Sequence, residues 1–326
     1  MSLKVIGIGE VLWDLLPAGR QLGGAPANFA YHAGALGAQA GMVTRVGRDA
    51  LGQEILCRLE QLRLPANLVQ VDETSPTGTV TVELAGEGVP NFTIHEHVAW
   101  DHLQLTDAAL ATARTADARC FGSLAQRAEP SRGTIQHLLR QSSPTALRIF
   151  DINLRQHFYS RTVIEPSLQL ANVLKLNDSE LSVLATLFEL KGDPQSQLTA
   201  LARHFDLRVV ALTLGSQGSL LYQDGHWSKC RTRSVRVEDT VGAGDAFTAA
   251  LALGLLRQMD LEAINLAANE VASCVCSCAG ATPPLRDSLR NLFLQPRAET
   301  TAPIPLPCGS ARPGSTLEIR EVEYYA

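Results

Sequence analysis

Residues 239–247 read Asp239-Thr240-Val241-Gly242-Ala243-Gly244-Asp245-Ala246-Phe247, and a helical pattern rich in small residues follows. The two glycines around Ala243 let the backbone approach a ligand closely. The first N–H groups of a helix lack partners within it and lie at the positive end of its dipole, which favours a phosphate at this turn. An aspartate would repel that phosphate, so Asp245 predicts a base placed beside it. The alternative interpretation is a turn that Asp245 simply caps.

A second loop, Gly23-Gly24-Ala25-Pro26-Ala27-Asn28, combines paired glycines with a proline at a helix start. Such a sequence predicts a tight turn with Asn28 in the first helical turn. The amide of Asn28 can bind a neutral polyol. Alternatively, Asn28 only caps the loop.

Outside these loops, short apolar runs alternate with longer helical patterns, which favours a mostly parallel sheet covered by helices on both faces. The predicted strands are Val5–Ile8, Gly41–Val46, Ala118–Phe121, Leu147–Asp151, Val173–Leu176 and Val209–Thr213. The predicted helices are Pro26–Leu36, Leu51–Gln61, Thr106–Thr115, Arg132–Arg140, Ser179–Leu190, Leu198–Phe205, Ala243–Leu256 and Ile264–Ser277.

The segment Thr77–Ile94 breaks this rhythm. Residues 79–84 alternate between polar and apolar, Ala85-Gly86-Glu87-Gly88 is typical of a turn, and residues 91–94 alternate again. The pattern predicts an antiparallel hairpin, which we expect to project as a lid or a dimer contact.

Composition narrows the class of protein. The chain has 326 residues, of which 45% are hydrophobic and 19% charged, and this suits one large α/β domain. A net charge of -5 without a basic cluster argues against a nucleic-acid partner. No apolar run is long enough to span a membrane, and the N-terminus predicts a strand rather than a signal peptide, so we expect a cytoplasmic protein. Seven cysteines, an odd number at irregular spacing, predict reduced and mostly buried thiols.

The two glycine-containing loops together identify a resemblance. Residues 23–47 and 239–252 resemble the two signature motifs of the PfkB, or ribokinase-like, carbohydrate kinases, and the resemblance extends over about residues 1–290. It implies a ribokinase-like three-layer α/β sandwich with a mostly parallel central sheet and a small β-hairpin lid. The implied kinase domain is 1–295, with the lid inserted around 77–100, and 296–326 is a proline-rich C-terminal tail.

The same resemblance implies an enzyme that transfers the γ-phosphoryl group of ATP to a sugar hydroxyl. Asp245 is the expected base, and the N–H groups of Gly242, Ala243 and Gly244 are the expected anion hole. Arg155, in Asp151-x-Asn153-x-Arg155, is expected to contact the sugar or the γ-phosphate. The other implied sugar contacts are Asp14, Gly23, Gly24, Asn28 and Phe92.

Further motifs imply the nucleotide and cation sites. Asn177 and Glu180 resemble the family's Asn-x-x-Glu motif, in which Glu180 holds Mg²⁺ through water. Asp239 stands where relatives bind a monovalent cation, often K⁺. The expected ATP contacts are Asn177, Glu180, Thr213, Gly215, Gly218, Gly242, Gly244 and Asn269.

The segment Glu10-Val11-Leu12-Trp13-Asp14 is most similar to the corresponding segment of bacterial fructokinases, so we expect D-fructose as the substrate. The alternatives are a 2-keto-3-deoxygluconate kinase, in which Arg155 would meet the acid, a ribokinase, a nucleoside kinase and a non-catalytic sugar or nucleotide sensor. A dinucleotide site at Gly7–Leu12 is rejected because the third glycine is missing. A metal site at Cys274, Cys276 and Cys278 is rejected because zinc spacing is absent. The hairpin makes a homodimer through the lid plausible.

Overall fold

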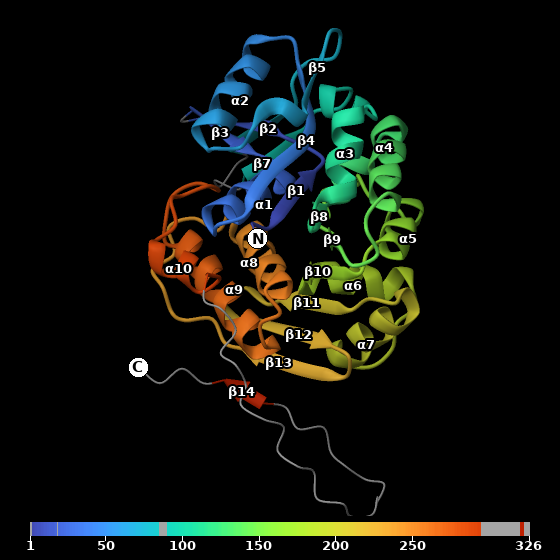
Figure 1. Ribbon diagram of the computed structural model, residues 1–326, viewed down its shortest axis with the longest axis vertical. Coiled ribbons are helices and arrows are strands. Elements are labelled where there is room, and N and C mark those ends of the chain that lie inside the picture. Colours follow the sequence, from blue (N-terminus) through green and yellow to red (C-terminus); the bar gives the residue numbers. More distant parts are fainter. Residues whose placement is uncertain (1, 18, 85–89, 295–319, 323–326) are drawn as a thin grey trace, which may run out of the picture.

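The computed structural model describes residues 2–17, 19–84, 90–294 and 320–322. Within them a large sheet runs through the molecule, and a smaller sheet lies at one end (Figure 1). The predicted turn at residues 85–88 and most of the predicted tail fall outside the described residues.

The large sheet is mostly parallel, as predicted. Strands β5, β4, β1, β8, β9, β10 and β11, which follow one another across the sheet, pair in parallel, whereas β12 is antiparallel to both β11 and β13. Its order is β14 (Arg320–Val322), β13 (His226–Cys230), β12 (Ser219–Gln223), β11 (Val209–Thr213), β10 (Val173–Asn177), β9 (Leu147–Asp151), β8 (Ala118–Phe121), β1 (Lys4–Ile8), β4 (Gln39–Gly47) and β5 (Val69–Asp72).

Helices cover both faces of this sheet, which gives the three-layer sandwich (Figure 1). One face carries α1 (Ala25–Ala35), α8 (Ala243–Leu256), α9 (Leu261–Cys276) and α10 (Asp287–Asn291). The other carries α3 (Asp107–Thr115), α4 (Glu129–Arg140), α5 (Arg161–Leu170), α6 (Asp178–Leu187) and α7 (Pro194–Phe205), while α2 (Ala50–Gln61) packs at the β4 end.

Adjacent residues of one strand pack into the hydrophobic cores on opposite faces of the sheet, because strand side chains alternate between the faces. Val5 and Val173 pack under α1, α8 and α9, and their neighbours Ile6 and Leu174 pack under the helices of the other face. All four side chains are almost completely buried. This explains why the central strands read as continuous apolar runs.

The small sheet confirms the predicted hairpin and adds to it. Strands β6 (Thr79–Leu84) and β7 (Pro90–Ile94) pair antiparallel. Two strands that the sequence analysis did not predict, β2 (Leu12–Leu16) and β3 (Gly19–Gly23), complete the order β3-β2-β6-β7. Half of the lid therefore comes from the N-terminal region.

The predicted helices and strands are present, with ends displaced by a few residues. Helix α5, which contains Pro166, was not predicted, and β12 and β13 were also missed. Short 3₁₀ turns occupy Ala66–Leu68, Ala99–His102, Leu124–Gln126 and Gly215–Gln217. No helix among the described residues is long and apolar enough to cross a membrane.

The cysteines form no disulfide among the described residues. Cys120 and Cys230 are buried, and Cys274, Cys276 and Cys278 are half-buried. Cys57 is exposed, so the prediction of mostly buried thiols was wrong at this position. The described part of the chain contains no cluster of three metal-ligating side chains.

Candidate active site

Several predicted site residues, and acidic residues close to them, lie where the parallel strands of the large sheet end. Glu10 follows β1, Asp151 ends β9, Asn177 ends β10 and Thr213 ends β11. Open α/β sheets bind their ligands outside the carboxyl ends of the strands. The N-termini of α1 and α8 come to the same edge because these helices pack against each other.

Asn28 and Asp245 are brought together across 217 positions of sequence. The amide Nδ2 of Asn28 donates to Oδ2 of Asp245 at 2.8 Å. Asn28 is buried, and its Oδ1 has no partner among the described residues. The two glycine-containing loops thus form one site, in which an acceptor oxygen of Asn28 is left for a ligand.

Gly23 and Gly24 make room for two acidic residues. A Cβ at Gly23 would overlap Oδ2 of Asp14, which lies on the neighbouring strand β2. Gly24 has a φ of 113°, and a Cβ there would overlap the carbonyl oxygen of Glu10. Any larger side chain at either position would displace the loop that carries Asn28.

Three carboxyl groups of this region have raised pKa values. Burial is the main cause in each case, and it raises the pKa of Asp14 to about 6, of Glu10 to about 7 and of Asp245 to about 7. The charge of Asp151 raises the pKa of Asp245 further, and the hydrogen bond from Asn28 lowers it.

Arg155 is the cation that all three carboxyl groups share. Its charge lowers the pKa of Asp14, Glu10 and Asp245. The side chain is exposed, and its Nη1 donates to the carbonyl of Leu154 at 3.0 Å. The structure shows no ion pair between Arg155 and Asp151, so the alternative of a surface pair between these two is wrong.

Asp151 instead belongs to a buried network with Lys175. Its Oδ1 lies 3.0 Å from Nζ of Lys175, and its Oδ2 accepts from the hydroxyl of Thr248 at 2.8 Å. Lys175 also lies under the anion-hole loop, because a Cβ added at Gly244 would stand 3.0 Å from its Nζ. A buried positive charge is therefore held beneath the N-terminus of α8.

Helix α8 is preceded by Gly242, whose φ of 79° favours glycine. No side chain caps this helix end. The N–H of Ala243 donates to the carbonyl of Thr240 at 3.3 Å, a long hydrogen bond. The turn thus offers N–H groups to an anion, which is the arrangement that the sequence analysis predicts for residues 242–244.

Asn177 and Glu180 form a reciprocal cap at the start of α6. Oδ1 of Asn177 accepts from the N–H of Glu180, and Oε2 of Glu180 accepts from the N–H of Asn177, both at 2.8 Å. Oε1 of Glu180 accepts from the N–H of Leu154 at 3.0 Å. Each carboxylate oxygen keeps a lone pair, so this group fits a role in holding water around a metal ion.

The predicted nucleotide turn meets Asn269 through Thr232. The hydroxyl of Thr232 donates to the carbonyl of Gly215 at 3.1 Å and lies 3.4 Å from Oδ1 of Asn269. Thr213 ends β11, and Gly218, with a φ of 101°, closes the turn against the carbonyl of Cys230.

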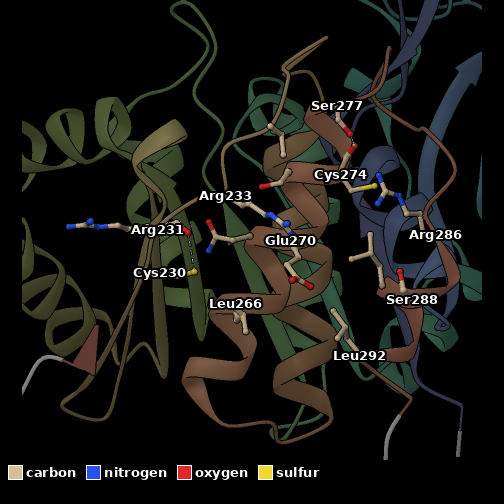
Figure 2. A pocket seen from close by; sticks show the side chains of 14 residues that line it. Cys230, Arg231, Arg233, Leu266, Glu270, Cys274, Ser277, Arg286, Ser288 and Leu292 are labelled. Carbon is tan, nitrogen blue, oxygen red and sulfur yellow. Dashed lines mark hydrogen bonds between the residues drawn. The ribbon is translucent and has the colours of Figure 1, made fainter. Parts of the chain in front are cut away.

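Asn269 lines a cavity of about 520 Å³ (Figure 2). Helix α9 forms its floor, residues 230–235 form one wall, and α10 with the residues before it forms the other. In the figure Arg233 reaches across α9 toward Glu270, whereas Arg231 points away. The cavity is large enough for a nucleoside.

Two predicted residues lie apart from the buried cluster. Phe92 is 50% exposed on β7, and its carbonyl accepts from the side-chain amide of Gln156. This hydrogen bond ties the lid to the segment that carries Arg155. Asp239 accepts from the N–H groups of Val241 and Gly280, each at 3.0 Å, and so joins the anion-hole loop to residues 277–281.

The model of the pfkB family carbohydrate kinases matches residues 18–288. The chain belongs to this family. An uncharacterized sugar kinase of Pyrococcus horikoshii is 30% identical over 306 residues, which cover 87% of this chain and 94% of that protein. The crystal structure of that kinase with ATP has a TM-score of 0.76, 28% identity, and coverage of 90% and 100% of the two chains. The fructokinase of Escherichia coli is 32% identical and covers 78% of this chain and 85% of its own.

As a carbohydrate kinase of this family, the protein is an ATP-dependent phosphotransferase. Three residues of its site were missed by the sequence analysis: Lys175, Thr248 and Glu10. Lys175 could have been found from the sequence, because it lies inside the apolar run Val173–Leu176 and a charge is not buried without a partner. Glu10, an acidic residue directly after an apolar strand, could have been found in the same way, but the sequence analysis assigned it no role in the site.

Proposed function

We propose that this kinase phosphorylates a neutral sugar, D-fructose, to fructose 6-phosphate. The observation that carries the proposal is the hydrogen-bonded pair of Asn28 and Asp245, in a region that also contains the buried Glu10 and the half-buried Asp14, whose pKa values are both lowered by the charge of Arg155. These oxygens are hydrogen-bond acceptors, which suits the hydroxyl donors of a polyol. They would repel the carboxylate of a sugar acid. Arg155, whose charge lowers the pKa of all three carboxyl groups, is the cation that would have to bind such a carboxylate. The fructokinase relative supports the same choice.

The proposed reaction uses residues from both glycine-containing loops. Asp245 accepts the proton of the attacking hydroxyl, which Asn28 helps to hold in place. The N–H groups at the start of α8 stabilise the charge of the phosphoryl group as it moves from ATP to the sugar oxygen. Lys175 contributes a fixed positive charge below this turn. Glu180, through water, would hold Mg²⁺, which neutralises charge on the phosphates.

The test of this function is ADP release with Mg-ATP and a panel of acceptors: fructose, ribose, 2-keto-3-deoxygluconate, adenosine and fructose 6-phosphate. We expect turnover with fructose to exceed that with every other acceptor. Faster turnover with another member of the panel would replace fructose as the substrate. Silence with all of them, from folded protein that binds ATP, would favour the sensor.

The variant Asp14→Ala should raise the KM for the sugar much more than the KM for ATP. Asp14 lies on the lid strand β2, beside Gly23 in the sugar loop, whereas the expected ATP contacts lie on α6, α8, α9 and the turn after β11. Loss of a hydrogen bond to a charged group corresponds to about 10-fold or more in sugar affinity. Steady-state kinetics in both substrates measure this, with Asp107→Ala, an exposed carboxylate on α3, as control. Equal increases of both KM values would show that Asp14 is structural.

Activity should depend on pH through Asp245. Because its pKa is about 7, the carboxylate form that accepts a proton is lost as the pH falls below 7. We therefore expect kcat/KM for the sugar to fall about 10-fold per pH unit on the acid side. A profile from pH 5 to 9 measures it, and a rate that stays flat down to pH 5.5 would contradict it. Since the pKa of Asp245 is raised from 3.8 to about 7 on folding, the stability that its protonated form contributes is present at low pH and is lost as the pH rises from about 4 to 7, with no further loss above that.

A monovalent cation is proposed at the junction that Asp239 makes with residues 277–281. Each carboxylate oxygen of Asp239 accepts one backbone N–H group and keeps a lone pair, and oxygen is the ligand that such an ion prefers. Because the ion would steady the anion-hole loop, we expect kcat to be several-fold higher in K⁺ than in choline salts of the same ionic strength. Identical rates in K⁺, Na⁺ and choline salts would contradict the proposal of a monovalent-cation site.

A further inference from the structure

A second cavity, of about 470 Å³, lies outside the proposed active site. We call it the α2–β3 cavity. It is bounded by Trp13, the lid strand β3, helix α2 and a loop before α10. The lining residues are Trp13, Arg20, Gln21, Leu22, Glu54, Cys57, Arg58, Gln61, Ala279, Gly280, Ala281 and Thr282.

This cavity faces the side of the lid opposite to the proposed sugar site. Trp13 and Asp14 are adjacent on β2, and successive side chains of a strand point to opposite faces. Trp13 lines the cavity and donates its indole N–H to the carbonyl of Leu51 at the start of α2. Asp14 lies against Gly23 of the sugar loop. A molecule in the cavity therefore does not compete directly for the sugar site.

The chemistry of the lining is that of a site for an anion with hydroxyl groups. Two guanidinium groups, Arg20 and Arg58, and one carboxylate, Glu54, line the cavity. Arg20 is paired with Glu54 and stacks over Trp13 at 5.5 Å from the ring centroid, and both members of the pair are more than a third exposed. The guanidinium group of Arg58 donates to the side-chain oxygen of Gln61 at 3.1 Å. Planar guanidinium groups bind phosphate in bidentate fashion, and the exposed pair with Glu54 costs little to exchange.

The cavity also touches the anion-hole loop. The carbonyl of Ala281 lies 2.9 Å from Nε2 of His32, and a Cβ on Gly242 would overlap this same carbonyl. Gly280 donates to Asp239 at 3.0 Å. A ligand that contacts residues 279–282 therefore presses on the backbone that positions the start of α8, and its other contacts lie on the lid.

We propose that the α2–β3 cavity binds a small phosphorylated sugar, which bridges the lid to the loop at residues 279–282 and lowers turnover. The two arginines hold the phosphate, and the side chains of Gln21, Gln61 and Thr282 meet the hydroxyl groups. The bridge restrains the lid, whose opening releases product. Binding in this cavity does not depend on which sugar the enzyme phosphorylates.

The binding test uses the exposed thiol of Cys57, which lies in the lining. Full-length protein is alkylated with N-ethylmaleimide, and the modified peptide is quantified by mass spectrometry, with and without fructose 1,6-bisphosphate. We expect the bisphosphate to slow modification of Cys57 at least fivefold, and Arg58→Gln to abolish this protection. Arg233→Gln, in the other cavity, is the matched control and should retain it.

Three outcomes would overturn the proposal. The first is the absence of protection at 10 mM bisphosphate, because this concentration would fill most of a site whose Kd is on the order of 1 mM. The second is protection that persists in Arg58→Gln, which would place the ligand elsewhere. The third is equal protection by inorganic phosphate, which would show a general anion site rather than a sugar phosphate site.

The coupling is tested separately by kcat at saturating substrates. The bisphosphate should lower kcat at least twofold in the wild type and leave it unchanged in Arg58→Gln, whose basal kcat should equal that of the wild type. Protection of Cys57 without any change of kcat would overturn the coupling to the anion-hole loop.

Discussion

Replacing Asp245 with asparagine should lower kcat by about 10²–10⁴-fold while leaving ATP affinity close to that of the wild type. The asparagine is nearly isosteric, and its Oδ1 can still accept the 2.8 Å hydrogen bond from Nδ2 of Asn28. What it loses is the ability to take a proton from the sugar hydroxyl. The N-terminus of α8, which we expect to contact the phosphates, keeps its backbone N–H groups.

The measurement pairs steady-state turnover with calorimetric titration of ATP. Glu238→Gln is the matched control, because it also removes a carboxylate from the exposed segment that leads into α8 and is not expected to touch the substrate. That control should change kcat by less than twofold. Near-normal turnover in Asp245→Asn would mean that another group accepts the proton, and Glu10 would be the first to examine.

The second large effect concerns stability. Lys175→Met should lower the free energy of unfolding by about 3–5 kcal/mol, because it leaves the buried carboxylate of Asp151 without its cation. The side chains of Lys175 and Asp151 are only 8% and 4% exposed, so water cannot replace the lost partner. The hydroxyl of Thr248 remains as a donor, but one neutral hydrogen bond does not offset a buried charge.

Urea unfolding at pH 7 without ligands measures this difference. The double variant Asp151→Asn with Lys175→Met removes both charges and should recover most of the loss, since the remaining amide can still accept from Thr248. Lys191→Met, at an exposed lysine, should change stability by no more than about 0.5 kcal/mol. A single variant as stable as the wild type, or a double variant no better than the single, would refute the argument.

The sequence analysis predicted those parts of the site that depend on local backbone conformation. Gly242 has a positive φ, and Gly23 and Gly24 have no room for a Cβ. Because these backbone positions require glycine, the glycines in the sequence predict the turns. The central strands were equally visible, because burial on both faces requires continuous apolar runs. The hairpin of β6 and β7 was predicted because its turn and its alternation lie within one short segment.

The other half of the lid could not be predicted in the same way. Strand β2 pairs with β6, more than 60 residues away, and that pairing is what makes residues 12–16 a strand of the lid instead of a continuation of β1. Asp14 gains its place beside the proposed sugar loop from this pairing, and Trp13 gains its place in the α2–β3 cavity. Periodicity in a five-residue run carries no information about such a distant partner.

The amino-acid sequence by itself thus determined the α/β class, the two glycine-containing loops and the identity of Asp245, since each depends on local sterics or on simple alternation of apolar residues. Only the tertiary structure decided that Asn28 bonds to Asp245, that Lys175 lies under Gly244, and that three carboxyl groups share the charge of Arg155. These relations arise because parallel strands bring their carboxyl ends to one edge of the sheet, and burial there changes the chemistry of every ionisable group.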